Sequence, residues 1–209
     1  AWVLRGFLKE GEIRGFFADG IDAHLWARYG TDGRDEAPRD GEHDEIVALA
    51  VSKEPAIPES PEGLECRMAT QEDAPLLAEL LSETFPEYPT PLDAETLSKD
   101  IRMGARQFCL LTDHEGRIAA AASAEIDQQR RSAEMTDCAT RPEFRGRGLM
   151  SHLLHTLELD LAREQGIRDL YTLARADEPG MNCAFAKLGY TYTGRLVNNC
   201  RMPNGWESM

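Results

Sequence analysis

A short turn with two glycines and two arginines is the part of this sequence best suited to binding a ligand. It runs Arg145-Gly146-Arg147-Gly148-Leu149-Met150, between an expected strand and an expected amphipathic helix. The glycines let the backbone approach a ligand closely, and the N–H groups that open a helix are unpaired and carry the positive end of its dipole. Such a site binds pyrophosphate, and Arg145 and Arg147 add positive charge. The alternative is a plain strand-to-helix turn.

Two other phosphate-binding motifs do not fit this turn. A Walker loop needs Gly-Lys-Ser/Thr, and a dinucleotide fingerprint needs a third glycine and a later acid after a parallel strand. The stretch Thr140-Arg141-Pro142-Glu143-Phe144-Arg145-Gly146-Arg147-Gly148 instead resembles the acetyl-CoA motif of GNAT acetyltransferases, Arg/Gln-x-x-Gly-x-Gly/Ala. One departure is Met150, where that pattern has Gly or Ala. The resemblance implies an N-acetyltransferase with acetyl-CoA as acetyl-donor cosubstrate and no metal.

The same resemblance implies how the chain holds acetyl-CoA. The strand that ends at Thr140 should lend backbone N–H and C=O groups to the pantetheine arm, as a strand edge pairs with a peptide. The strand expected at Leu170 to Ala174 should splay from it and leave a gap for the thioester. The expected cofactor-binding residues are Cys138, Ala139, Thr140, Arg145, Gly146, Arg147, Gly148, Leu149, Met150, Asn182 and Phe185.

Acetyl transfer to an amine needs a base, because only the neutral amine attacks. Glu134 is our first candidate, since it lies four residues before Cys138 and strand alternation would put both side chains on one face. GNAT histone acetyltransferases show a similar Glu-x-x-x-Cys arrangement. Asp137 and Glu125 are the reserve candidates, and a carboxylate that only positions the amine, with water taking the proton, is the alternative.

The leaving thiolate needs a proton, and the tetrahedral oxyanion needs hydrogen-bond donors. Alignment on Lys187-Leu188-Gly189-Tyr190 puts Phe185 where related enzymes have a tyrosine that acts as general acid. Phenylalanine has no proton to donate. Tyr190 is therefore the candidate acid, with Tyr192 nearby, unless water helps the thiolate to leave. Asn182 could hydrogen-bond either the cofactor or the chain itself.

Further blocks between residues 85 and 209 resemble the β-lysine N-acetyltransferase family. They include Phe85-Pro86-Glu87-Tyr88-Pro89, Gly194-Arg195-Leu196-Val197-Asn198-Asn199 and Glu207-Ser208-Met209. That family acetylates the terminal amine of β-lysine and makes Nε-acetyl-β-lysine, a compatible solute. A diamino acid needs carboxylates for its ammonium groups and a cation or amide for its carboxylate. The candidate substrate-binding residues are Glu87, Tyr88, Glu125, Asn198 and Glu207, with Arg102 or Arg195 for the carboxylate.

Two alternatives stay open. The acceptor could be another small amine or amino acid, which rates with β-lysine, α-lysine and spermidine would distinguish. A non-catalytic CoA-binding sensor is the alternative of another class, favoured by Met150 and Phe185 and opposed by Glu134 and the intact glycine turn.

The elements that would position these residues follow from residue 64 in the order β-α-α-β-β-β-α-β-α-β-β. Thr70 and Asp73 form a capping box before a helix with Leu76, Leu77, Leu80 and Leu81 at helical spacing. Three strands, 107–112, 117–126 and 133–140, fit an antiparallel meander, and leucines at 149, 153, 157 and 161 line the next helix. The last strands are expected near 190–197 and around Trp206. The fold class is α/β (α+β): a GNAT acyl-CoA N-acyltransferase fold with a mixed, mostly antiparallel sheet flanked by helices.

The sequence divides into three parts. Residues 1–30 resemble the tail of a partial GNAT-like N-terminal half, residues 31–63 an acidic, proline-containing linker, and residues 64–209 the acetyltransferase domain. Ile46 to Val51 could be a strand or one helical turn within the linker. A weak repeat equates Gly6, Gly11 and Ile13 with Gly189, Gly194 and Leu196. The first residue is not methionine, so we expect a piece of a longer protein. The resemblance to the β-lysine N-acetyltransferase family, which continues past the Met, implies that the final strand is incomplete.

Composition limits the partners. The 209 residues carry a net charge of −14, which disfavours nucleic acid and is compatible with a cationic substrate. Mean hydropathy is −0.46 and no stretch approaches the ~20 apolar residues of a membrane span. Five cysteines without a CxxC pair predict reduced thiols in the cytoplasm and no metal. GNAT-like enzymes often pair, which leaves a homodimer open.

Overall fold

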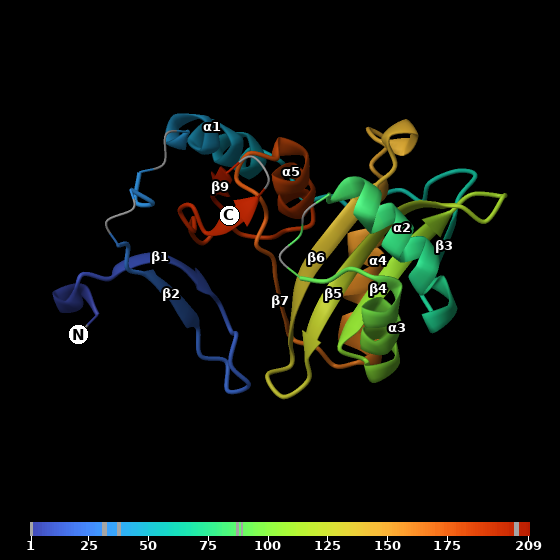
Figure 1. The fold of residues 1–209 in the computed structure, drawn as a ribbon, viewed down its shortest axis with the longest axis horizontal. Coiled ribbons are helices and arrows are strands. Elements are labelled where there is room, and N and C mark those ends of the chain that lie inside the picture. Colours follow the sequence, from blue (N-terminus) through green and yellow to red (C-terminus); the bar gives the residue numbers. More distant parts are fainter. Residues whose placement is uncertain (1, 31–32, 37–38, 87, 89, 203–204) are drawn as a thin grey trace. The chain divides into compact units, whose positions relative to one another are not determined.

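The computed structural model describes residues 2–30, 33–36, 39–86, 88, 90–202 and 205–209. The chain forms two compact units (Figure 1). One unit is Ala56–Thr172, and the other joins Ala1–Pro55 with Leu173–Met209. Within the described ranges, no helix is both long and apolar enough to cross a membrane. The three-part division expected from the sequence stays a prediction.

A five-stranded sheet in the order β3-β4-β5-β6-β7 forms the centre of unit Ala56–Thr172. Its strands are β3 (Glu65–Met68), β4 (Arg106–Thr112), β5 (Ile118–Asp127), β6 (Ser132–Thr140) and β7 (Asp169–Tyr171). All neighbours pair antiparallel except β6 and β7, which are parallel and joined through a helix. The predicted meander and the mixed, mostly antiparallel sheet are confirmed.

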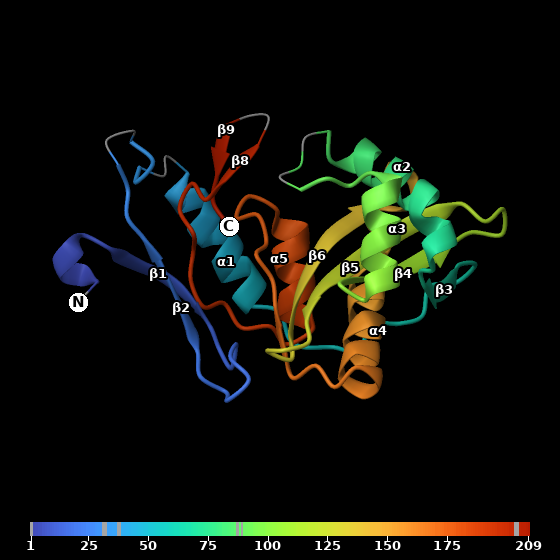
Figure 2. The same cartoon turned by 60° about the horizontal axis from the view of Figure 1, so that its bottom comes forward.

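Helices α2 (Ala74–Thr84) and α3 (Ala94–Met103) cover one face of this sheet, as both views show (Figures 1 and 2). The capping box of Thr70 and Asp73 is formed, and the Asp93 carboxylate caps α3. Leu77, Leu80 and Leu81 are fully buried against strand residues, each contributing roughly 1.5–3 kcal/mol. Leu76, in the same helix, is 45% exposed and lies on its solvent side.

Helix α4 (Leu149–Glu164) covers the opposite face and connects β6 to β7. Its four predicted leucines are all buried, and Leu154 joins them. The spacing of four residues places them on one stripe, which packs on the sheet because burial removes that apolar surface from water. The helix thereby fixes the glycine turn at the carboxyl end of β6.

The second unit contains two short hairpins and two helices. Strands β1 (Leu8–Ile13) and β2 (Ala23–Ala27) pair antiparallel, as do β8 (Cys200–Met202) and β9 (Gly205–Glu207). Helix α1 spans Asp40–Val51 and α5 spans Pro179–Lys187. The predicted strand or single turn at residues 46–51 was wrong, because the acidic residues before it form the first turns of a three-turn helix.

The strand expected near residues 190–197 is also absent from the described elements. The chain there lies beside β1 in an irregular path, with the Arg195 N–H donating to the Glu10 carbonyl at 2.9 Å. A Cβ on Gly194 would lie 2.1 Å from the Glu10 oxygen and 2.4 Å from the Gly11 Cα, so only glycine fits. Gly11 and Gly194, which the sequence repeat equates, therefore touch each other.

Candidate active site

The glycine turn presents the amino end of α4. Gly148 is the N-cap residue with φ 72°, and Gly146 has φ 74°, both in the left-handed region that favours glycine. No side chain caps the helix, so its first N–H groups are left to another partner. Gly146, Arg147 and Gly148 are exposed, whereas Leu149 is buried and anchors the helix. This arrangement fits the pyrophosphate of a coenzyme.

The two arginines of the turn differ in what they contact. The Arg145 Nε donates to the Thr140 carbonyl at 3.1 Å and ties the turn to the end of β6. The Arg147 guanidinium lies 5.7 Å from the Phe144 ring centroid and donates to the Glu62 carbonyl at 3.4 Å. Both side chains stay exposed. Met150 is half-buried behind them, one residue into the helix.

The carboxyl half of β6 lacks a strand on one side among the described residues. Pairing with β7 covers Ser132, Ala133 and Glu134 and stops there, while β6 continues to Thr140. No described strand pairs with its later residues on that edge, which leaves room there for another extended chain. The gap expected beside Cys138, Ala139 and Thr140 therefore has a structural basis.

A β-bulge interrupts β6 at Asp137 and Cys138. Ala139 pairs with Ala121 and Thr136 with Ser123, so two steps on β5 match three on β6. Asp137 has φ 47°, in the left-handed region. The extra residue has no partner on β5. The side chains after the bulge therefore lie on the opposite face from the one that strict alternation would give them.

The bulge corrects one expectation from the sequence. Glu134 shares a face with Ala139, which packs toward α2 and α3, and not with Cys138. Burial and the Asp137 charge raise the pKa of the Cys138 thiol, which stays protonated. The side chain of Cys138 is thus a packing group on the α4 face, and the Glu-x-x-x-Cys spacing does not place both groups together.

Four charged groups from three strands meet on the α2/α3 face. Arg106 is 7% exposed and forms ion pairs with Glu125 and, at 3.2 Å, with Asp137. Asp137 is buried and also accepts a hydrogen bond of 2.7 Å from the Ser123 hydroxyl. Register places Arg106, Glu125 and Glu134 side by side across β4, β5 and β6. Three carboxyl groups thus face a single guanidinium.

Glu134 is the carboxyl group whose environment suits proton transfer. Burial, followed by the charge of Glu125 and then that of Asp137, raises its pKa from 4.5 to about 7. A hydrogen bond from the Tyr171 side chain and the charge of Arg106 act in the opposite direction. Tyr171 itself has its pKa raised to about 12, first by burial and then by Glu134, so it remains a donor near neutral pH.

Tyr88 lies at the same face, with its hydroxyl 3.4 Å from the Thr136 Oγ1. Burial and the charge of Asp137 raise the pKa of Tyr88, so its hydroxyl stays protonated. Its aromatic ring packs against Phe85, with ring centroids 5.0 Å apart and the planes tilted by 39°. Of the predicted substrate residues, Tyr88 and Glu125 are therefore brought together with Glu134, while Glu87 lies outside the described residues.

The predicted residues of α5 belong to the other unit. Phe185 is buried and packs edge-on against Tyr190, with ring centroids 5.0 Å apart. The Asn182 amide donates to the carbonyls of Arg175 and Glu178, both at 2.9 Å, so it bonds the chain itself. Tyr192 is 49% exposed. Phe185 therefore fills the expected general-acid position with a buried side chain that has no proton to donate.

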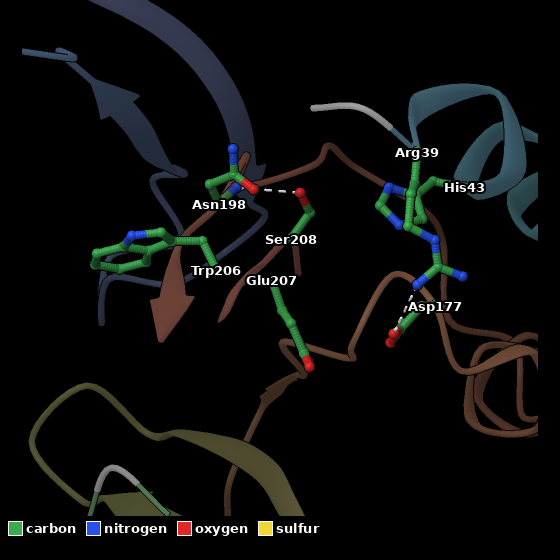
Figure 3. Close-up of a pocket in the computed structure, with 7 residues that line it drawn as sticks. All are labelled: Arg39, His43, Asp177, Asn198, Trp206, Glu207 and Ser208. Carbon is green, nitrogen blue, oxygen red and sulfur yellow. Dashed lines mark hydrogen bonds and ion pairs between the residues drawn. The ribbon is translucent and has the colours of Figure 1, made fainter. Parts of the chain in front are cut away.

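Asn198 and Glu207 line a small pocket of about 60 Å³ within the second unit (Figure 3). The Asn198 amide donates to the Arg34 and Glu36 carbonyls at 2.7 and 2.8 Å. Glu207 accepts a hydrogen bond of 3.0 Å from the Arg175 Nη2 and forms an ion pair with the Arg175 Nε at 2.7 Å. The remaining lining residues are Arg39, His43, Asp177, Trp206 and Ser208. These internal contacts favour a scaffolding role for both side chains, and their role as substrate ligands stays a prediction.

The two arginines proposed for a substrate carboxylate lie in different units of the chain. Arg195 is paired with Asp40 at 3.2 Å and Asp44 at 2.7 Å, whereas Arg102 is exposed on α3. The sequence reasoning missed Arg106 and Tyr171. A charged residue at the start of a buried strand was a signal for Arg106, but Tyr171 becomes visible only through the parallel pairing of Glu134 with Tyr171. Over the described ranges, no cluster of three or more His, Cys, Asp or Glu could hold a metal ion.

Comparison with known proteins agrees with this geometry. The sequence profile of the Acetyltransferase (GNAT) family matches residues 74–190. The chain is 37% identical over 226 residues to the beta-lysine N(6)-acetyltransferase of Methanosarcina mazei, covering 98% of this chain and 82% of that protein. It is 36% identical to the N-acetyltransferase YodP of Bacillus subtilis, covering 97% and 73%. The spermidine/spermine N-acetyltransferase of Vibrio cholerae shares the fold, with a TM-score of 0.61 over 71% of this chain and 91% of that one, at 16% identity. The chain belongs to the GNAT acetyltransferase family.

Proposed function

We propose that this acetyltransferase moves the acetyl group of acetyl-CoA onto the terminal amine of β-lysine, which yields Nε-acetyl-β-lysine. The relative from Methanosarcina mazei, similar over nearly the whole chain, carries that activity in its name. The acidic face around Glu134 supports a cationic acceptor, since Glu125, Glu134 and Asp137 outnumber Arg106 there.

The coenzyme is held by groups that the fold leaves without partners. The uncapped N–H groups of α4, with Arg145 and Arg147 beside them, bind the pyrophosphate. The unpaired edge of β6 from Cys138 to Thr140 pairs with the pantetheine arm. Acetyl-CoA supplies the acetyl group as an activated thioester.

Glu134 accepts a proton from the substrate ammonium, which leaves the neutral amine that attacks the thioester. The burial of this carboxyl group beside Glu125 and Asp137 is the observation that carries the proposal. A base is most effective when its pKa lies near the working pH, and burial brings the pKa of Glu134 to about 7. The Tyr171 hydrogen bond orients the carboxylate toward the face that it shares with Glu125. Asp137 is already held by Arg106 and Ser123, so we assign it a positioning role.

The substrate's second ammonium has a partner on the same face. The Glu125 side chain is 44% exposed, although Arg106 contacts one of its oxygens, so it can meet an incoming cation. Tyr88 closes the face with an aromatic wall and a protonated hydroxyl. Phe185 has no proton to donate, and the donor to the leaving thiolate, for which the sequence offers Tyr190 or water, stays a prediction. A compatible-solute role, a cytoplasmic location and a homodimer remain predictions from the sequence.

The test is release of free thiol from acetyl-CoA with purified protein, with β-lysine, α-lysine or spermidine as acceptor. We expect the highest kcat/KM with β-lysine and a loss of about 10²- to 10⁴-fold in Glu134→Gln. The matched control is Glu65→Gln, which alters an exposed strand carboxylate of the same sheet and should keep full activity.

Other outcomes separate the alternatives. Faster turnover of spermidine or α-lysine would keep the acetyltransferase and replace the substrate. Binding of acetyl-CoA without thiol release from any amine would favour a sensor. Equal loss in both glutamine variants would remove Glu134 from the role of base.

A further inference from the structure

Two cysteines lie in contact beneath α4, away from the acidic face. The Cys66 Sγ on β3 is 3.6 Å from the Cys109 Sγ on β4. Cys66 also lies 3.9 Å from the Thr156 Oγ1, and that hydroxyl donates to the His152 carbonyl at 2.9 Å. His152 also lowers the pKa of the Cys66 thiol. The proposed acetyl transfer uses none of these groups.

The two sulfurs are close to each other but are not bonded. A disulfide needs an S–S distance of about 2.05 Å, so the two sulfurs must approach by roughly 1.5 Å. Cys66 pairs with Leu111 and Met68 with Cys109, which makes the two cysteines diagonal neighbours on one face. Strand β3 is a four-residue edge strand, held by a neighbouring strand on one side.

The two thiols have unequal surroundings. Cys66 is partly exposed, whereas Cys109 is fully buried. The Cys109 thiol, with Thr156 and His152, lowers the pKa of Cys66 despite its burial. The hydrogen bond to Cys66 and burial raise the pKa of Cys109, and Asp160 on α4 adds to this rise. The accessible sulfur is therefore the one favoured as a thiolate, and only a thiolate is a good nucleophile.

We propose that Cys66 and Cys109 form a peroxide-reactive cysteine pair, with Cys66 as the attacking and Cys109 as the resolving thiol. The Cys66 thiolate attacks one oxygen of hydrogen peroxide, the O–O bond breaks, and the departing hydroxide takes up a proton to become water. The resulting Cys66 sulfenic acid is attacked by the Cys109 sulfur. The S–O bond breaks, the S–S bond forms, and the Cys109 proton leaves with the hydroxyl as a second water. Two thiols are oxidised and one peroxide is reduced to two waters.

The test treats the full chain with hydrogen peroxide near neutral pH, alkylates the remaining thiols, and maps peptides by mass with and without a reductant. We expect a Cys66–Cys109 cross-linked peptide, lighter by two hydrogen atoms and restored by dithiothreitol. Cys66 should react at least about tenfold faster than Cys200, whose pKa is raised by burial.

Variants locate each step. In Cys109→Ala the disulfide cannot form, so dimedone should trap a sulfenic acid on Cys66. Cys66→Ala should leave Cys109 reduced, and Cys200→Ala should react as wild type does. The proposal is overturned when wild-type protein loses other thiols first, or when Cys66 and Cys109 are both alkylated after peroxide treatment.

Discussion

Replacing Glu134 by glutamine should abolish most of the activity and at the same time stabilise the fold at alkaline pH. Glu134 is half-buried beside Glu125 and Asp137, so its ionised form is disfavoured in the folded chain. Glutamine has nearly the same shape, keeps an oxygen that can accept from Tyr171, and carries no charge at any pH. The substitution therefore removes the electrostatic cost of ionising this position along with the base.

The magnitude follows from the pKa. A rise from 4.5 to about 7 corresponds to about 3 kcal/mol between the two protonation states, at ~1.4 kcal/mol per pKa unit. The folded pKa lies above the unfolded one, so folding takes up a proton between these values and wild-type stability falls as pH rises through that window. Glu134→Gln lacks this fall. The variant should match wild type below pH 4.5 and exceed it by up to about 3 kcal/mol at pH 8.

The assay is urea unfolding of wild type, Glu134→Gln and the exposed control Glu65→Gln at pH 5 and pH 8. With a denaturant slope of ~1–3 kcal/mol/M, the gain of about 3 kcal/mol should raise the Glu134→Gln midpoint at pH 8 by roughly 1–3 M over wild type. The control should change little at either pH. A Glu134→Gln protein that gains no stability between pH 5 and pH 8 relative to wild type would refute the raised pKa, and with it the physical reason for choosing this base.

Four other substitutions test the remaining parts of the site and the capping box before α2. Tyr171→Phe removes a hydrogen bond that lowers the pKa of Glu134, so the acidic limb of the kcat/KM profile should move to higher pH; Glu125→Gln removes a negative neighbour and should move it to lower pH. Gly148→Ala forces a side chain into a backbone with φ 72°, at about 1–2 kcal/mol, and should raise the KM for acetyl-CoA more than it lowers kcat. Asp73→Ala removes the capping box and should destabilise the chain by roughly 1–2 kcal/mol at pH 7 in thermal or urea unfolding. Because its ion-pair partner lowers the pKa of Asp73 from 3.8 to about 2, that difference should shrink as pH falls between these values.

Each of these has a result that contradicts it. Movement of both pH profiles in the same direction would show that Tyr171 and Glu125 do not act through the charge of Glu134. Gly116→Ala, with φ 77° in the β4–β5 turn, is the matched control for Gly148→Ala, and an equal KM effect in both would show a general loss of stability. A constant stability gap from pH 7 to pH 2 would exclude the titration of Asp73.

The sequence determined the local parts of this protein. The capping box of Thr70 and Asp73, the glycine turn at Gly148 and the buried leucines of α4 depend on residues within a few positions of each other. Such features follow from helix geometry and backbone sterics alone, so their spacing is visible in the chain. The order of strands and helices from residue 64 to α5, and the family motif at the amino end of α4, could be predicted for the same reason.

Strand register decided which side chains meet at the candidate active site. The bulge at Asp137 separates Glu134 from Cys138, because one inserted residue moves every later side chain to the other face. Arg106, Glu125, Glu134 and Tyr171 come from four strands, and their meeting depends on pairings between residues far apart in sequence. The pKa of Glu134 depends on how much water and charge those neighbours leave around it. The candidate carboxyl groups for a base could be named from the sequence. Only the tertiary structure shows which of them, Glu134, has a pKa raised to about 7.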